Sequence, residues 1–210
     1  MNTLTNPNLV LWAARLIAAA WASWAFAWVV LSLKTKPVLR RERIATAISY
    51  RPPILLSLLL LVFGPGTHVG AALIAAGPAT AWLYTRFIPV ELGVVWLGAP
   101  LVVLGLGFAA WARLHLADNW SGPVTLRRDH ELIRTGPYRF VRHPIYTGVL
   151  FAILGTACAT GAPRGFLAFA LVFAALWYKS RVEERLMAET FGDAYRSYRA
   201  EVRGLIPFVF

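Results

Sequence analysis

Two polar segments of this chain carry residues whose types and spacing could bind a charged ligand. In the first, Arg142 and His143 stand directly before Pro144, and Tyr146 follows within the next turn. A residue before proline avoids the α-helical region, and proline is well tolerated in the first turn of a helix, so Pro144 predicts a helix start. Free backbone N–H groups and the helix dipole favour an anion there. We therefore predict that Arg142 and His143 bind a ligand carboxylate, with a basic membrane boundary as the alternative for Arg142.

The second polar segment contains a pair of carboxylates. Glu183 and Glu184 follow directly on an apolar stretch and are flanked by Arg181 and Arg185. A solvated, salt-bridged helix face is the simpler explanation of such a pair. Carboxylates this close to a membrane segment are costly, however, and a basic loop lies opposite them. The pair is therefore a candidate cation-binding site.

Aromatic and imidazole groups surround these two segments. Tyr138 and Tyr146, with Trp120, could stack on a purine or enclose a cation, and anchoring at a membrane interface is the alternative. The four histidines show no metal-ligand spacing, and no cysteine or carboxylate cluster joins them; they are His68, His115, His130 and His143. We therefore expect no bound metal.

The composition predicts the elements that must position these residues. Of 210 residues, 58% are hydrophobic and only 15% are charged, which argues against a water-soluble globular domain and against disorder. The net charge is +11, but 18 of the 21 Lys and Arg residues fall within residues 34–51, 113–142 and 179–203. Because cytoplasmic loops of membrane proteins collect Lys and Arg, this charge predicts topology and not nucleic-acid binding.

Apolar stretches between the basic segments predict an all-α membrane bundle of about five transmembrane helices, since a helix needs about 20 apolar residues to cross the bilayer. They span approximately residues 9–33, 53–87, 90–111, 145–161 and 166–178. The 53–87 stretch contains two Gly-Pro interruptions and is interpreted as one crossing plus an irregular outer segment. The first stretch lacks a basic region and a cleavage site, so it is expected to be a retained span. This topology places all three basic segments on the cytoplasmic face.

A helix is predicted to continue beyond the last apolar stretch. Apolar and aromatic residues recur there with helical spacing, at Leu186, Met187, Phe191, Tyr195 and Tyr198. Gly192 weakens this helix, which is expected to end near Gly204. The result is a C-terminal amphipathic helix at the cytoplasmic face.

Two motifs carry a family resemblance. "HELIRTGPYRFVRHPIYTG" and, about one hairpin later, "RVEERLMAETFGDAYRSYRAEVRGLIPF" resemble the isoprenylcysteine carboxyl methyltransferases, especially their short prokaryotic members, over roughly residues 119–208. The resemblance implies transmembrane helices that hold S-adenosyl-L-methionine in a cytosolic-side pocket closed by the C-terminal helix. A lipophilic or prenylated substrate then enters from the bilayer. One domain, 1–210, is expected, with N-terminal spans in 1–112 and a cofactor-binding core in 113–210.

The implied reaction is S-adenosylmethionine-dependent O-methylation of a carboxylate, as in isoprenylcysteine carboxyl methylation. Methylation of a small thiol or a phospholipid amine, or an NADPH-dependent reduction of a lipid or sterol, are the alternatives. The expected setting is a bacterial inner membrane with a cytoplasmic C-terminus. The expected partners are the lipid bilayer and the substrate, without nucleic acid or metal, and the oligomeric state stays open.

The resemblance also implies roles for individual residues. Combined with the residue patterns above, it assigns cofactor contacts to His130, Leu132, Ile133, Tyr138, Arg142, His143, Pro144, Ile145, Tyr146, Glu183 and Glu184. His143 would hold the cofactor carboxylate and Glu183 its ammonium group. A basic residue before the glutamates, Lys179 or Arg181, would bind the substrate carboxylate. Arg181 and Glu183 are the candidate catalytic residues.

Overall fold

The computed structural model describes residues 6–32, 38–41, 44–117, 125–127 and 132–206, and the fold is all-helical apart from two short strands. The helices are α1 (Pro7–Ser32), α2 (Ile44–Val62), α3 (His68–Ala75), α4 (Pro78–Tyr84), α5 (Ala99–Leu116), α6 (Pro144–Thr160), α7 (Pro163–Phe191) and α8 (Asp193–Glu201). A π-helical segment, Leu92–Gly98, leads into α5, and a 3₁₀ turn covers Gly136–Arg139. The strands are β1 (Val38–Arg41) and β2 (Thr125–Arg127). The predicted all-α class is confirmed.

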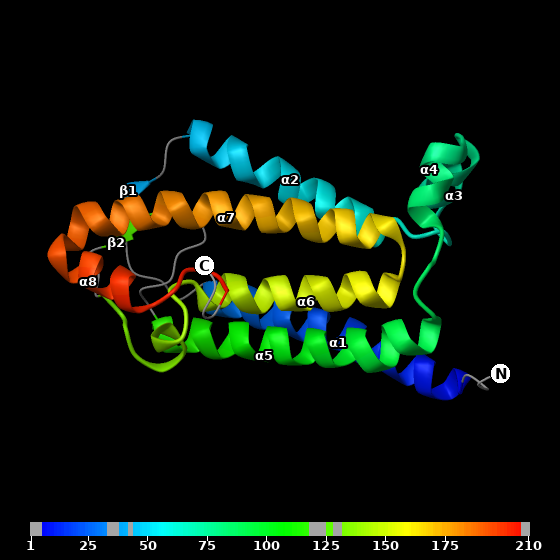
Figure 1. Cartoon of the computed structure of the whole chain (residues 1–210), viewed down its shortest axis with the longest axis horizontal. Helices are drawn as coiled ribbons and strands as arrows, with labels where there is room; N and C mark the ends of the chain where they lie inside the picture. Colours follow the sequence, from blue (N-terminus) through cyan, green and yellow to red (C-terminus); the bar gives the residue numbers. More distant parts are fainter. Residues whose placement is uncertain (1–5, 33–37, 42–43, 118–124, 128–131, 207–210) are drawn as a thin grey trace.

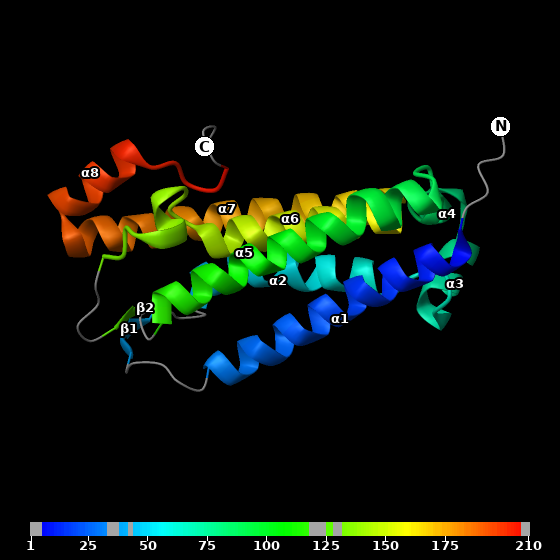
Figure 2. The same cartoon turned by 90° about the horizontal axis from the view of Figure 1, so that it is seen from below.

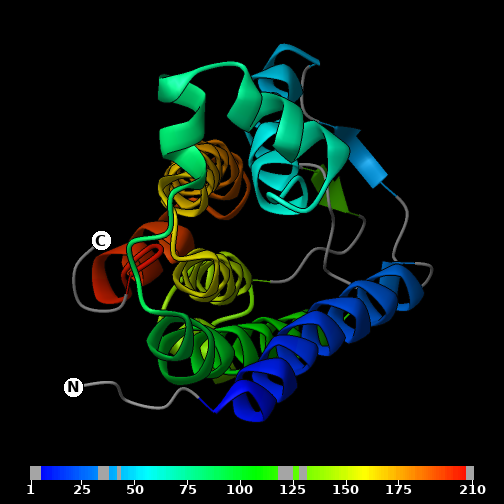
Figure 3. The ribbon, with the colours of Figure 1, turned by 90° about the vertical axis from the view of Figure 1, so that its right-hand side faces the viewer.

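The long helices lie side by side along the molecule. Figure 1 shows α2 beside α7 and α6 between α7 and α5, and the end-on view in Figure 3 shows α1 against α5. β1, β2 and α8 lie at one end, whereas α3 and α4 lie at the other (Figures 1 and 2). β1 pairs with β2 in antiparallel register, with Val38 opposite Arg127. The described parts of the three basic segments therefore gather at one end, which we call the β1–β2 end.

Three helical segments are long and apolar enough to cross a membrane: Pro7–Ser32, Leu92–Leu116 and Pro163–Phe191. Two shorter apolar helices, Thr46–Val62 and Pro144–Thr160, run beside them. Large apolar side chains such as Phe26 and Leu104 are exposed on the outside of this bundle, where lipid is their natural solvent. The number of crossings stays a prediction.

One long helix, α2, is followed by a segment that was predicted to be irregular, and that prediction is wrong because most of the segment is helical. α3 and α4, of 8 and 7 residues, complete it at the end away from β1 and β2. Two cations outside the basic segments are explained here. Arg164 donates to the carbonyl oxygen of Leu60, near the end of α2, and Arg86 donates to Ala159 O at 2.5 Å, at the end of α6. Each guanidinium thus caps helix carbonyls that lack a partner within the helix.

Close packing fixes where α6 begins. A Cβ placed on Gly105 would lie 2.5 Å from the carbonyl oxygen of Gly148, so α5 and α6 approach at backbone distance. On its other side, α6 packs against α7 through a core cluster formed by Leu150, Ile153, Val172 and Leu176. The start of α6 is consequently held next to the C-terminal half of α7.

The predicted C-terminal helix does not run unbroken to Gly204, and that prediction is wrong. α7 ends at Phe191, Gly192 adopts φ +53°, and α8 then turns back toward the bundle (Figure 1). Glycine allows this left-handed conformation at little cost, so the break falls where the sequence weakens the helix. Tyr195 and Tyr198 are buried, which shows that the predicted apolar positions of α8 do face the protein.

Candidate active site

The predicted helix start at Pro144 is confirmed, and His143 is its N-cap residue. The C-terminal segment runs along this helix start. The backbone N–H groups of Arg142 and His143 donate to the carbonyl oxygens of Arg203 and Gly204, at 2.8 and 3.1 Å. The Thr147 hydroxyl donates to Leu205 O at 2.6 Å. The backbone N–H groups of Arg142 and His143, which were predicted to bind an anionic ligand, therefore have hydrogen-bond partners within the protein.

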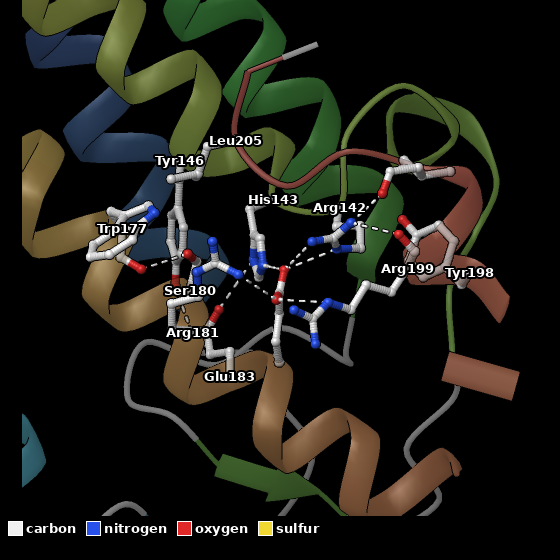
Figure 4. A network of polar contacts seen from close by, with 12 residues as sticks. Arg142, His143, Tyr146, Trp177, Ser180, Arg181, Glu183, Tyr198, Arg199 and Leu205 are labelled. Carbon is white, nitrogen blue, oxygen red and sulfur yellow. Dashed lines mark hydrogen bonds and ion pairs between the residues drawn. The ribbon is translucent and has the colours of Figure 1, made fainter. Parts of the chain in front are cut away.

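Arg142 links this helix start to α7 and α8 (Figure 4). Its Nε and Nη2 atoms lie 2.9 and 2.5 Å from Glu184 Oε1. Its Nη1 atom donates to the carbonyl oxygens of Arg199, at 3.2 Å, and Val202. Both side chains are buried, with exposed fractions of 8% for Arg142 and 5% for Glu184. The sequence predicted a ligand-binding cation, and the structure gives Arg142 an internal ion pair.

The second oxygen of Glu184 has a different environment. Glu184 Oε2 lies 3.7 Å from Arg181 Nη1 and 3.7 Å from Arg199 Nε. At these distances the contacts are ion pairs and not hydrogen bonds. The oxygen is buried, and it has no hydrogen-bond donor among the residues that the structure describes. It could accept a hydrogen bond from an incoming ligand.

Glu183 belongs to a separate group on the other side of His143. The Tyr146 hydroxyl donates to Glu183 Oε1 at 2.5 Å, and Lys179 Nζ lies 3.9 Å from the same oxygen. His143 Nδ1 is 3.5 Å from Glu183 Oε2. The rings of His143 and Tyr146 stack with centroids 5.5 Å apart and an interplanar angle of 3°. A carboxylate, two parallel aromatic rings and an ammonium group therefore meet at one point.

His143 connects the two glutamates. Its Nε2 atom lies 3.4 Å from Glu184 Oε1, while Nδ1 faces Glu183. Burial lowers the pKa of His143, but the hydrogen bonds and negative charges of both glutamates outweigh burial, and the net pKa is above the ordinary 6.5. The protonated ring has two N–H donors, one for each carboxylate.

This raised pKa predicts how stability depends on pH. Below pH 6.5 the histidine is protonated in folded and unfolded chains, so its contribution is fully present, and it is lost as the pH rises through the higher pKa of the folded state. We expect the Tm difference between wild type and His143→Gln in detergent to be largest near about pH 6 and to shrink toward about pH 9. A difference that grows with pH would contradict this assignment.

Lys179 and Arg181 occupy different positions on α7. Lys179 is buried, with 8% of its surface exposed, and its ammonium lies 5.4 Å from the centre of the Tyr146 ring. The Arg181 side chain is 42% exposed and its guanidinium lies over the ring of Trp177 at 5.4 Å. Lys179 therefore points into the Glu183 group, whereas Arg181 lies at the rim beside Glu184.

Tyr138 lies behind the ionic groups in an apolar cluster. Tyr138, Ile145 and Ala112 form its buried part, and Ile133 and Tyr146 pack against it. Burial raises the pKa of Tyr198, so its hydroxyl stays protonated and donates to the Tyr138 carbonyl oxygen at 2.5 Å. The α8 helix is thereby fastened to the segment before α6.

The structure brings most of the predicted residues together at the β1–β2 end. Those in one group are Ile133, Tyr138, Arg142, His143, Pro144, Ile145, Tyr146, Lys179, Glu183 and Glu184. Leu132 lies within the described residues and is partly buried. His130 and Trp120 lie outside the described residues. Two residues of the site were not predicted. Arg199 could have been indicated only by its place in the predicted amphipathic helix, and Tyr50 of α2, whose ring centre lies 5.2 Å from Lys179 Nζ, carries no sequence signal. Within the described ranges, no three His, Cys, Asp or Glu side chains are grouped as metal ligands.

The fold and the site define an integral membrane protein with a buried cluster of ion pairs at one end of its helices. Residues 94–194 match the family described as phospholipid methyltransferase. The probable protein-S-isoprenylcysteine O-methyltransferase of Oryza sativa subsp. japonica is 30% identical over 157 residues, which cover 72% of this chain and 75% of the rice protein. The chain therefore belongs to the protein-S-isoprenylcysteine O-methyltransferase family and is a methyltransferase.

Two further comparisons match a smaller share of the related protein than the rice comparison does. The protein-S-isoprenylcysteine O-methyltransferase of Schizosaccharomyces pombe is 35% identical over 112 residues, which is 50% of this chain and 46% of that enzyme. The solved structure of the eukaryotic intramembrane Ras methyltransferase, an isoprenylcysteine carboxyl methyltransferase, superposes with a TM-score of 0.49 at 22% identity. The superposition covers 78% of this chain and 63% of that one.

Proposed function

We propose that this chain transfers a methyl group from S-adenosyl-L-methionine to the carboxylate of an S-isoprenylated cysteine held in the membrane. Family membership supports the reaction class. The observation that carries the proposal is the Glu183 group, in which a half-buried carboxylate contacts Tyr146, His143 and Lys179 at the end of membrane-length helices. This group offers one anion and one cation side by side, as a charged donor and an anionic acceptor require.

The residues present fit the methyl donor. Glu183 is a carboxylate whose nearest charged neighbours lie 3.5 and 3.9 Å away, so its oxygens can accept hydrogen bonds from the ammonium group of S-adenosylmethionine. The parallel rings of His143 and Tyr146 lie beside Glu183, and the face of a tyrosine ring attracts a cation. When bound, S-adenosylmethionine would supply a methyl group on a positively charged sulfur. The acceptor carboxylate oxygen would bond to that methyl carbon in line as the carbon–sulfur bond breaks and neutral S-adenosylhomocysteine leaves.

Within this proposal, the protein positions the reactants and moves no proton. Glu183 would hold the donor's ammonium group, and Lys179 would orient the acceptor carboxylate. Because that acceptor is already ionised, no general base is needed, and catalysis depends on alignment and on exclusion of water. Arg142 and Glu184 would keep α6, α7 and α8 in place around the reactants.

The site's position supports an orientation in the membrane. It lies at the β1–β2 end, where the three basic segments gather, and such segments favour the cytoplasm. We place the C-terminus in the cytoplasm of a bacterial inner membrane. The donor then reaches the site from water and the acceptor reaches it from lipid.

The deciding experiment uses purified protein in detergent, methyl-labelled S-adenosylmethionine and an S-farnesylated N-acetylcysteine. We expect a labelled product that releases its label in mild base, as a methyl ester does. A base-stable label on a thiol or a phospholipid amine would instead support those alternatives. Absence of saturable S-adenosylhomocysteine binding, with NADPH binding in its place, would overturn the proposal in favour of a reductase.

A further inference from the structure

Helix α2 contributes one aromatic side chain to the Glu183 group. Tyr50 lies near the β1–β2 end of α2, and only 4% of its surface is exposed. α2 packs along α7 and lies outside residues 94–194, the segment shared with the phospholipid methyltransferase family (Figure 3). Tyr50 therefore reaches the site from a part of the chain that the shared segment does not include.

The rings of Tyr50 and Tyr146 both lie close to the Lys179 ammonium. Lys179 Nζ is 5.2 Å from the centre of the Tyr50 ring and 5.4 Å from that of the Tyr146 ring. Both distances lie within the range at which the face of an aromatic ring attracts a cation, and the attraction is stronger where water is excluded. Two rings from different helices thus fix the ammonium 3.9 Å from Glu183 Oε1.

The rest of α2 faces the surroundings. Leu55 and Leu58, on the turns after Tyr50, are exposed large apolar side chains. One helix therefore borders lipid along its length and reaches Lys179 at one end. Tyr50 and Lys179 are buried at that end, where α2 packs against α7.

We propose that Tyr50 is a positioning residue for the methyl acceptor: its ring holds the Lys179 ammonium where the acceptor carboxylate arrives. This inference rests on the proposed function and adds an acceptor determinant supplied by α2. It places selection of an anionic, lipid-borne acceptor at the contact between α2 and α7.

The test compares Tyr50→Leu with Tyr50→Phe, and Ile48→Ala serves as a control on the exposed face of the same helix, where 63% of Ile48 is exposed. Tyr50→Leu removes the ring and is expected to raise the KM for S-farnesylated N-acetylcysteine about tenfold. The Kd for S-adenosylhomocysteine should change by less than about twofold, because the donor contacts lie on α6 and α7. Tyr50→Phe retains the ring and should restore a KM near that of wild type, as should Ile48→Ala.

A second readout measures the charge preference directly. The free acid and the carboxamide of a non-reactive S-farnesyl analogue are compared as competitive inhibitors. Wild type should prefer the acid, and Tyr50→Leu should lose most of that preference.

Three outcomes would overturn the inference. One is an unchanged KM and acid preference in Tyr50→Leu while wild type methylates the acceptor. Another is an equal loss of acceptor and S-adenosylhomocysteine affinity together with a lower Tm, which indicates a structural role. The third is a Tyr50→Phe variant as defective as Tyr50→Leu. Wild type that binds S-adenosylhomocysteine but methylates no farnesylated acid overturns the proposed function itself.

Discussion

Glu184→Gln is expected to destabilise the protein, whereas Glu183→Gln is expected to weaken donor binding and leave the fold intact. Glu184 pairs with Arg142 at 2.5 Å, and both side chains are buried. Removing one partner of a buried ion pair leaves the other charge uncompensated, at a cost of about 3–5 kcal/mol. For a chain of this size, we expect Tm in detergent to fall by about 10 °C.

Glu183→Gln removes a charge whose ion pairs within the protein are longer than the ion pair between Glu184 and Arg142. Its charged neighbours, Lys179 and His143, lie at 3.9 and 3.5 Å, so the fold depends on it less than on Glu184. A hydrogen bond to a charged group contributes about 1.5–3 kcal/mol, so the Kd for S-adenosylhomocysteine should rise roughly 10- to 100-fold. Isothermal titration and thermal unfolding of both variants measure the two effects separately.

The matched control is Glu201→Gln. Glu201 forms an ion pair with Arg134 at 2.7 Å, but both side chains are exposed. Exposed pairs contribute at most about 1 kcal/mol, so this variant should keep nearly wild-type Tm and Kd. Equal losses of S-adenosylhomocysteine affinity in Glu183→Gln and Glu184→Gln, with no difference in Tm, would show that the division of roles within the pair is wrong.

Charged side chains at this depth in the protein need partners of opposite charge, and the structure supplies them. Two carboxylates are placed among Arg142, His143 and Lys179, with Arg181 and Arg199 at the rim. An isolated buried carboxylate is unstable at neutral pH, so each needs compensating charges and donors. The raised pKa of His143 is part of this compensation, because a protonated ring adds a positive charge between the two acids.

Local chemistry made parts of this fold and site predictable. A proline after His143 marks the start of α6, and the apolar stretches mark the long helices, because both signals act within a few residues of the chain. The glutamate pair is recognisable because carboxylates are costly at a membrane boundary. These features need no knowledge of the tertiary structure.

Other features depend on residues distant in the sequence and could not be predicted. Arg142 and Glu184 are 42 residues apart, so no local pattern shows that the predicted ligand-binding cation is paired within the protein. The β1–β2 pairing joins residues near 40 and 126, and Tyr50 reaches Lys179 only through the packing of α2 on α7. The end of α7 differs from the prediction because Gly192, at φ +53°, breaks the helix and does not merely weaken it.

Lys179→Met is expected to raise the KM for a farnesylated cysteine substrate roughly 100-fold, with Arg181→Met changing it by less than about threefold. The sequence offers both residues for the acceptor carboxylate and favours Arg181 as the catalytic one, but their surroundings in the structure favour Lys179. Lys179 is buried beside Glu183, whereas the Arg181 side chain is 42% exposed and faces Glu184. A buried charge forms a stronger pair than one in water, and a lost charge-assisted contact of about 2–3 kcal/mol corresponds to about 100-fold.

The measurement is a steady-state KM for the acceptor together with the Kd for S-adenosylhomocysteine in each variant. Methionine keeps most of the length of lysine and removes its charge, so the change tests the ammonium and not the packing of α7. Lys179→Arg is the informative companion, because a planar guanidinium cannot replace a compact ammonium between two rings 5.2 and 5.4 Å away without rearrangement. We expect partial activity from it. If Arg181→Met raises the acceptor KM more than Lys179→Met does, the acceptor carboxylate lies at the rim beside Glu184, and the assignment of Lys179 must be abandoned together with the positioning role of Tyr50.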